Sequence, residues 1–322
     1  MTLENKINKI QIQNFITESG ANYHTINLSY QVFGPNLNTA PIVLINHALT
    51  GNSQVIGEQG WWIDLVGENK TIDTLKYTVL AFNVPGNGYD GFLIENYQDF
   101  NTRDIAQLFN QGIKVLQVAQ LYAIIGGSVG GGIAWEMAAL EPKITQNLIP
   151  IATDWKSTDW LIANCFLQEQ ILANSSKPIE DARIHAMLCY RTPESFSAKF
   201  QRTPNEELQV FNVESWLAHH GAKLQNRFQL SAYKMMNQLL KTIDITRERD
   251  SFTAIASKIQ ANIHIIGIDS DLFFTANENR ATYLELKKYK ENVFYQEIVS
   301  IHGHDAFLIE YKQLNNFLEA IF

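Results

Sequence analysis

Residues 126–130 read Gly126-Gly127-Ser128-Val129-Gly130, between the apolar run 121–125 and a segment whose apolar side chains recur at helical spacing. A serine framed by glycines between a buried strand and a helix is the G-x-S-x-G nucleophile elbow. The glycines are needed because Cβ atoms beside the serine would clash with the adjoining strand and helix. The turn lifts the hydroxyl clear of the sheet, above the positive end of the following helix. The pentapeptide therefore predicts an activated nucleophile at Ser128.

Composition places the chain among ordinary globular proteins, with 322 residues, 46% hydrophobic and 18% charged. Its 25 basic and 33 acidic residues give a net charge of −8 without a basic stripe, which argues against nucleic acid and anionic membranes as partners. No segment approaches the ~20 apolar residues of a membrane span, and the first residues lack an apolar signal core, so we expect a cytoplasmic protein. Cys165 and Cys189 lack a C-x-x-C pattern and are expected to be small buried side chains, neither a disulfide nor a metal site.

Short apolar runs predict the strands of one sheet. Two half-exposed edge strands are expected at 8–15 and 23–33, and six buried strands at 42–45, 77–82, 121–125, 148–151, 263–266 and 293–298. Helical stripes, among them 105–116 and 307–321, separate most of the buried strands. This alternation predicts an α/β protein with a mostly parallel, doubly wound sheet.

One stretch interrupts the alternation. Between about residues 155 and 250 we find no convincing strand, but helical patterns at 160–171, 179–190 and 230–243. We therefore expect a core domain made of residues 1–154 and 251–322, with a helical insertion at 155–250. An insertion at this point lies over the carboxyl edge of the sheet, where open α/β sheets bind ligands, and would act as a lid.

Activation of Ser128 requires a base and a carboxylate, because a serine hydroxyl is a poor nucleophile until its proton is removed. With this elbow, the acid and then the histidine should follow late strands. Asp271 and His304 occupy these positions, with Asp269 and His302 as neighbouring rivals. These four side chains are of types that bind metal ions, but a metal site would leave the serine of the elbow unexplained. We therefore expect Asp271 and His304 to act with Ser128, without a metal.

The oxyanion of the tetrahedral intermediate needs preorganised backbone donors. One expected donor is the N–H of Val129, directly after the nucleophile, and the second comes from the loop at 46–51. In that loop His47 is expected to be structural, not a proton carrier. Trp61 and Trp62 could line an acyl tunnel or pack beneath the same loop, and the sequence leaves both possibilities open.

Several segments spread over nearly the whole chain match the motifs of one enzyme family. They are His47-Ala48-Leu49-Thr50-Gly51 (H-x-L-T-G), Gly60-Trp61-Trp62 (G-W-W), Gly126-Gly127-Ser128-Val129-Gly130-Gly131 (G-G-S-M-G-G), Ala182-Arg183 with Tyr190-Arg191-Thr192-Pro193-Glu194 (A-R…Y-R-[ST]-x-E), Ser270-Asp271-Leu272-Phe273-Phe274 (S-D-x-L-F) and Gly303-His304-Asp305-Ala306-Phe307-Leu308 (G-H-D-A-F-L). Through these residues the chain resembles the homoserine O-acetyltransferases of methionine biosynthesis. The resemblance implies an α/β-hydrolase fold with a helical lid insertion, and an acyltransferase.

The resemblance also implies a ping-pong mechanism. Ser128 would take an acyl group, expected to be acetyl, from acyl-coenzyme A, a co-substrate and not a bound cofactor. The hydroxyl of homoserine would then attack the acyl-enzyme. His304, held by Asp271, would act as base and then as acid, while Leu49 and Val129 would supply the oxyanion N–H groups.

The same matching implies a set of residues for the amino-acid substrate. Arg183 and Tyr190 would bind its carboxylate and Asp305 its ammonium group, with Thr50 nearby. Charge pairing of this kind is required once a pocket closes off water. Because Arg183 and Tyr190 stand seven residues apart, about two helical turns, both can project from one face of a lid helix.

The triad alone leaves other functions open. An esterase, thioesterase or lactonase would use the same three side chains with water as the acceptor. Succinyl-coenzyme A as donor and serine as acceptor also stay possible, since one methylene changes binding by only ~1–3 kcal/mol. An inactive binding module is disfavoured because the serine, the histidine and the acid are all kept. The family resemblance is also compatible with a homodimer formed through the helical insertion.

Overall fold

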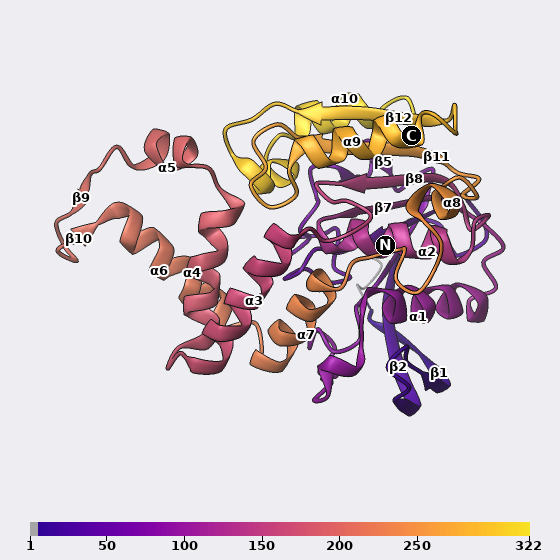
Figure 1. Ribbon diagram of the computed structural model, residues 1–322, viewed down its shortest axis with the longest axis horizontal. Helices are drawn as coiled ribbons and strands as arrows, with labels where there is room; N and C mark the ends of the chain where they lie inside the picture. Colours follow the sequence, from indigo (N-terminus) through magenta and orange to yellow (C-terminus); the bar gives the residue numbers. More distant parts are fainter. Residues whose placement is uncertain (1–5) are drawn as a thin grey trace.

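The computed structural model describes residues 6–322, whose backbone is organised around one eight-stranded sheet (Figure 1). The strand order is β1-β2-β6-β3-β7-β8-β11-β12. β1 and β2 pair antiparallel, β2 joins β6 antiparallel, and the remaining pairs are parallel. The strands are β1 (Asn8–Ile16), β2 (Asn22–Phe33), β3 (Ile42–Asn46), β6 (Thr78–Phe82), β7 (Leu121–Gly127), β8 (Thr145–Ile151), β11 (Asn262–Ile268) and β12 (Val293–Ile298). Each of the eight predicted runs lies in one of these strands, so the predicted mostly parallel sheet is confirmed.

Helices cover both faces of the sheet and divide the apolar side chains into two cores. Along β3, Leu44 belongs to the core beneath α1 and α2, whereas Val43 and Ile45 belong to the core beneath α10. A strand buried on both faces needs a continuous apolar run, which is why these segments do not alternate with polar residues. The covering elements are η1 (Tyr97–Asp99), α1 (Thr102–Val115), α2 (Val129–Leu140), α8 (Phe252–Ala256), α9 (Ala276–Leu286), η2 (Gly303–Leu308) and α10 (Tyr311–Leu318).

The stripe at 307–321 is divided between two elements, although the sequence predicts one continuous helix. Its first residues belong to η2, and α10 begins only at Tyr311, after Ile309 and Glu310 leave helical geometry. Phe307 in η2 and Leu314 in α10 still join the same core. The periodic pattern therefore identified the buried face but not the break.

The segment between β8 and β11 contains α3 (Asp159–Asn174), α4 (Pro178–Tyr190), α5 (Pro193–Phe200), α6 (Asn212–Gln225) and α7 (Leu230–Lys241). The prediction that it lacks strands is wrong in one detail: β9 (Pro204–Asn205) pairs antiparallel with β10 (Val210–Phe211). Two residues per strand are too few to give a periodic pattern. At the left of Figure 1, α5, the β9–β10 pair and the start of α6 form an arm that extends away from the sheet. A second short pair, β4 (Val66–Gly67) and β5 (Ile72–Asp73), is parallel.

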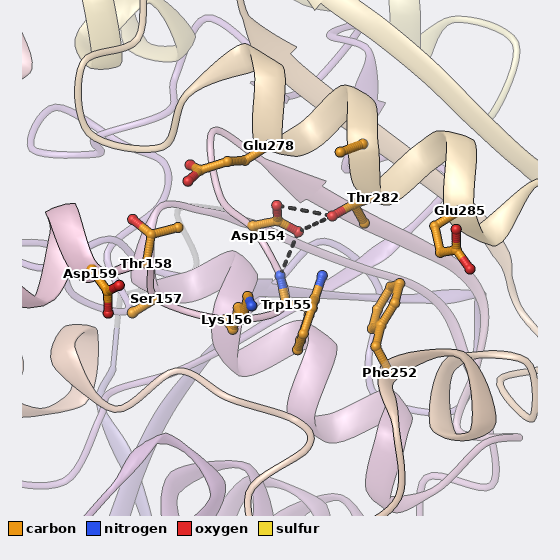
Figure 2. Close-up of a pocket in the computed structure, with 11 residues that line it drawn as sticks. Asp154, Trp155, Lys156, Ser157, Thr158, Asp159, Phe252, Glu278, Thr282 and Glu285 are labelled. Carbon is orange, nitrogen blue, oxygen red and sulfur yellow. Dashed lines mark hydrogen bonds between the residues drawn. The ribbon is translucent and has the colours of Figure 1, made fainter.

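A buried carboxyl group joins the end of β8 to α9. Asp154 accepts hydrogen bonds from the Thr282 hydroxyl, at 2.8 and 3.0 Å, and from the Trp155 N–H at 2.8 Å (Figure 2). It lines a surface cavity of about 450 Å³, in which the rings of Trp155 and Phe252 stack at 4.4 Å. Burial raises the pKa of Asp154 to about 7.

The raised pKa of Asp154 predicts how stability depends on pH. The folded state holds this proton up to about pH 7, whereas the unfolded chain releases it near the ordinary aspartate pKa of 3.8, so stability falls as pH rises through this interval. Asp154→Asn removes the charge and keeps an acceptor for Thr282. We expect its Tm to exceed that of the wild type by about 2–4 °C at pH 8, with the difference shrinking toward pH 4. Thermal unfolding across this range, with exposed Asp159→Asn as the control, tests this; a constant difference would contradict it.

Candidate active site

Ser128 occupies a strained turn between β7 and α2. Its φ of 57° and ψ of −130° lie in a region that L-residues rarely adopt, and it stands at the N-cap of the helix. The turn is fixed by its backbone: the Ser128 N–H donates to the Ile151 carbonyl of β8 at 2.9 Å, and its carbonyl accepts from the Gly131 N–H at 2.9 Å. The residue is buried, with 4% of its surface exposed. Backbone contacts with the neighbouring strand therefore hold the serine in place.

Close packing around the elbow explains its glycines. A Cβ on Gly126 would lie 2.5 Å from the carbonyl group of Gly130, and a Cβ on Gly130 would lie 2.4 Å from the Asn46 carbonyl oxygen. A Cβ on Gly131 would lie 2.2 Å from a methyl carbon of Thr153. These neighbours are backbone atoms or buried side chains, which cannot move aside. The α2 terminus thus approaches the end of β3 as closely as the backbone allows.

Two segments carry the backbone N–H groups that are expected to form the oxyanion hole. Val129 is the first residue of α2, where N–H groups have no partner within the helix. The second segment, residues 47–51, follows β3 and carries Leu49. The buried His47 fixes it: its Nδ1 bonds to the Ala48 carbonyl at 2.8 Å, and its Nε2 accepts from the Val84 N–H at 3.0 Å. Burial lowers the pKa of His47 to about 4, so the ring stays neutral and acts as a structural brace.

The structure brings together His304 and Asp271. His304 lies in η2 after β12, and its Nδ1 is 2.8 Å from Asp271 Oδ2. The other carboxylate oxygen, Oδ1, accepts from the N–H groups of Phe273 at 2.6 Å and Phe274 at 3.0 Å. These two bonds fix the direction in which the carboxylate faces His304. Because Nδ1 is engaged by Asp271, proton transfer falls to Nε2 of the imidazole.

Asp269 and His302, the rival candidates for the acid and the base, have other partners. Asp269 Oδ1 accepts from the Ser300 N–H at 3.0 Å, which ties the two late loops together. His302 Nδ1 lies 3.0 Å from the Ser195 hydroxyl of α5. Neither residue joins the His304–Asp271 pair.

Packing places η2 against the elbow. A Cβ on Gly127, the residue before Ser128, would lie 2.5 Å from the ring of Phe307, three residues after His304. The fully buried Trp62 supports Phe307 from beneath through an Nε1–carbonyl contact of 3.5 Å. Trp61 instead lines a cavity beside residues 50–52. Packing is thus shown for Trp62, whereas an acyl tunnel lined by Trp61 stays a prediction.

Aromatic rings surround the imidazole of His304. The rings of Tyr190, Phe273, Phe274 and Phe307 have centroids between 5.2 and 5.9 Å from it. His304 is accordingly buried, with 3% of its surface exposed. Tyr190 comes from α4, so the insertion contributes directly to these aromatic surroundings.

The residues expected to bind the amino acid are placed near the imidazole by α4 and η2. The Arg183 guanidinium lies 5.6 Å from the centroid of the Tyr190 ring. Burial raises the pKa of Tyr190 well above its usual value, which keeps its hydroxyl a neutral donor. Asp305 accepts a hydrogen bond from Arg191 Nε at 2.9 Å. The carbonyl of Thr50 accepts from Arg227 Nη1 at 3.0 Å.

The sequence did not indicate roles for the two arginines that contact Asp305 and Thr50. Arg191 directly follows Tyr190 within a matched motif, so a signal was present but no role was assigned to it. Arg227 gives no local signal, because it reaches Thr50 across 177 positions of sequence.

Other expectations concern the cysteines, metals and membranes. Cys165 and Cys189 are both free; Cys165 is buried in the core as predicted, whereas Cys189 is only half-buried, because it lies at the edge of that core. Among residues 6–322 there is no group of three or more His, Cys, Asp or Glu side chains that could hold a metal ion. Over the same residues, no helix has the length and apolar character to cross a membrane.

Comparison with known proteins agrees with this geometry. Residues 41–299 match the alpha/beta hydrolase fold family, which confirms the predicted fold class. The homoserine O-acetyltransferase of Cyclobacterium marinum is 32% identical over 95% of this chain and 92% of its own length. The homoserine O-acetyltransferase of Symbiobacterium thermophilum is also 32% identical, over 95% of this chain and 92% of its own length. The chain belongs to the homoserine O-acetyltransferase family.

Solved structures agree on the fold within this family and beyond it. A homoserine O-acetyltransferase from Bacillus anthracis superimposes with a TM-score of 0.88 at 18% identity, over 98% of this chain and 97% of that one. Esterase E22 superimposes with a TM-score of 0.87 at 15% identity, over 98% of this chain and 99% of the esterase. At these identities the likeness concerns the fold alone.

The geometry predicts which carboxylate supports His304. Asp271→Asn reverses the hydrogen-bonding character of one carboxylate atom, so the ring loses its fixed tautomer. We expect hydrolysis of p-nitrophenyl acetate and labelling of Ser128 by a fluorophosphonate to slow by about 10²–10⁴-fold. The matched control is Asp269→Asn, for which we expect rates close to wild type. Equal losses in the two variants would contradict the assignment.

Proposed function

We propose that this member of the family transfers an acetyl group from acetyl-coenzyme A to the side-chain hydroxyl of homoserine. The observation that carries the proposal is the His304–Asp271 hydrogen bond of 2.8 Å, in an element packed against the Ser128 elbow. That arrangement supplies a nucleophile, a base and a carboxylate in the required order. Membership of the family gives the donor and the acceptor.

In the first half-reaction, Ser128 Oγ attacks the thioester carbonyl while His304 Nε2 takes the hydroxyl proton. The N–H groups of Leu49 and Val129 hold the resulting oxyanion. When the tetrahedral intermediate collapses, the C–S bond breaks and His304 returns the proton to the departing thiolate. The products are free coenzyme A and an ester on Ser128.

In the second half-reaction, the homoserine hydroxyl attacks that ester and gives its proton to His304. The same two N–H groups hold the oxyanion. The bond to Ser128 Oγ breaks, and His304 reprotonates the serine. The enzyme returns to its starting state, so the reaction needs no bound cofactor.

The acceptor is held by charges from the insertion and from η2. Arg183 and the neutral Tyr190 hydroxyl pair with its carboxylate, and Asp305 accepts from its ammonium group, next to Thr50. Asp305 already bonds to Arg191, so its carboxylate is oriented before the substrate arrives. A carboxylate can accept from both cations at once.

The choice of acetyl as the acyl group rests on similarity to homoserine O-acetyltransferases. Succinyl is the alternative donor group. Serine is a possible alternative acceptor, because its carboxylate and ammonium groups are the same.

Hydrolysis is the second candidate function. Water can attack the same acyl-enzyme, and esterases share this fold. What favours transfer is the set formed by Arg183, Tyr190 and Asp305, for which a plain hydrolase has no use.

The acceptor site is tested by Arg183→Ala. We expect the KM for homoserine to rise at least tenfold, because the carboxylate loses its charged partner. Hydrolysis of p-nitrophenyl acetate should fall far less, since it needs only the triad. A coupled free-thiol assay with acetyl-coenzyme A measures the first quantity, and Arg202→Ala, on the exposed arm, serves as control. A parallel loss of both activities would reject the assigned role.

We also propose that two copies associate through the helical insertion. The arm exposes Leu208 and Phe211, whose side chains lie open over about half of their surface, at 57% and 42%. Light scattering coupled to gel filtration tests this: Phe211→Glu should convert a dimer to a monomer, and a monomeric wild type would reject it.

A further inference from the structure

A second, larger cavity adjoins the loop that carries Leu49. It has a volume of about 610 Å³ and lies between residues 50–52 and the end of α6. Thr50 and Gly51, which directly follow Leu49, line one part of it, Trp61 and Tyr89 give aromatic surface, and Lys223 and Arg227 bring positive charge. The cavity is large enough for part of an extended ligand.

Positive charge collects here although the chain as a whole has a net charge of −8. Three cations in this region, Lys223, Arg227 and Arg183, form no ion pair with a carboxylate among residues 6–322. Burial and then the charge of Arg183 lower the pKa of Arg227, which indicates that the two guanidinium groups lie close together. Cations without anionic neighbours in an acidic protein point to an anionic ligand.

Arg227 connects this cavity to the catalytic loop. Its Nη1 donates to the carbonyl of Thr50 at 3.0 Å, and Thr50 directly follows Leu49. A guanidinium has five N–H donors in a planar fork, so Arg227 can hold this carbonyl and still bind an anion. An anion bound at Arg227 would therefore restrain the segment that presents the Leu49 N–H.

We propose that this cavity binds the phosphate-bearing arm of the acyl donor, with Lys223 and Arg227 paired to its phosphate groups. The inference rests on the proposed function and adds a positioning role for Arg227. Binding energy from a remote part of the donor would then be used to align the oxyanion loop. The donor's phosphates, not only its thioester, determine the rate of acyl transfer.

The experiment compares two acetyl thioesters, acetyl-coenzyme A and acetyl-pantetheine, which lacks phosphate. With saturating homoserine, we expect the wild type to favour acetyl-coenzyme A in kcat/KM by at least tenfold. Lys223→Gln should reduce this preference about tenfold, through the KM for acetyl-coenzyme A. Arg227→Gln should reduce the preference similarly and also lower kcat with both donors, whereas Arg227→Lys should restore the preference but not kcat. The control, Lys199→Gln, changes an exposed lysine on α5 outside the cavity.

The outcomes separate this inference from the proposed function. A wild type without preference between the donors, or variants that leave the preference intact, would overturn the donor site. If no acetylhomoserine forms with either donor, but thioester hydrolysis shows the same preference and the same variant effects, the donor site is supported and the acceptor is rejected.

Discussion

The approach of α2 to the ends of β3 and β8 is the constraint on which the site depends. Gly126, Gly130 and Gly131 meet backbone or buried atoms at distances where a Cβ could not fit. At the same contact Ser128 adopts a strained backbone conformation, and the first N–H of α2 has no partner within its helix. One packing requirement thus underlies both the proposed nucleophile and half of the proposed oxyanion site.

Local chemistry explains what the sequence could predict. Six strands follow from apolar runs and β1 and β2 from half-exposed, alternating segments. The pairing of Asp271 with His304 follows from their positions after late strands. The break after Phe307 and the β9–β10 pair were missed, because a two-residue feature leaves no periodicity. Contacts between segments distant in the chain, such as Arg227 with Thr50, were also invisible. They depend on how the insertion folds back over the sheet, which no local pattern records.

Buried ionisable groups at the site are each held in one state. His47 stays neutral because burial opposes its charge, and Tyr190 stays protonated for the same reason. Asp271 is held by geometry instead, because two backbone N–H groups bind one of its oxygens and His304 Nδ1 contacts the other. The surroundings of each side chain, and not its residue type, therefore decide whether it braces a loop, donates a hydrogen bond or accepts one.

The helical insertion and the sheet contribute different parts of the chemistry. Ser128 and His304 belong to the core elements, whereas Arg183, Tyr190 and Lys223 come from α4 and α6. If the proposed roles hold, substitutions in those helices alter which molecules are recognised and leave the triad in place. The same fold occurs in a homoserine O-acetyltransferase and in an esterase, so the shape of the chain does not distinguish the two reactions and the residues that the insertion brings to the site must do so.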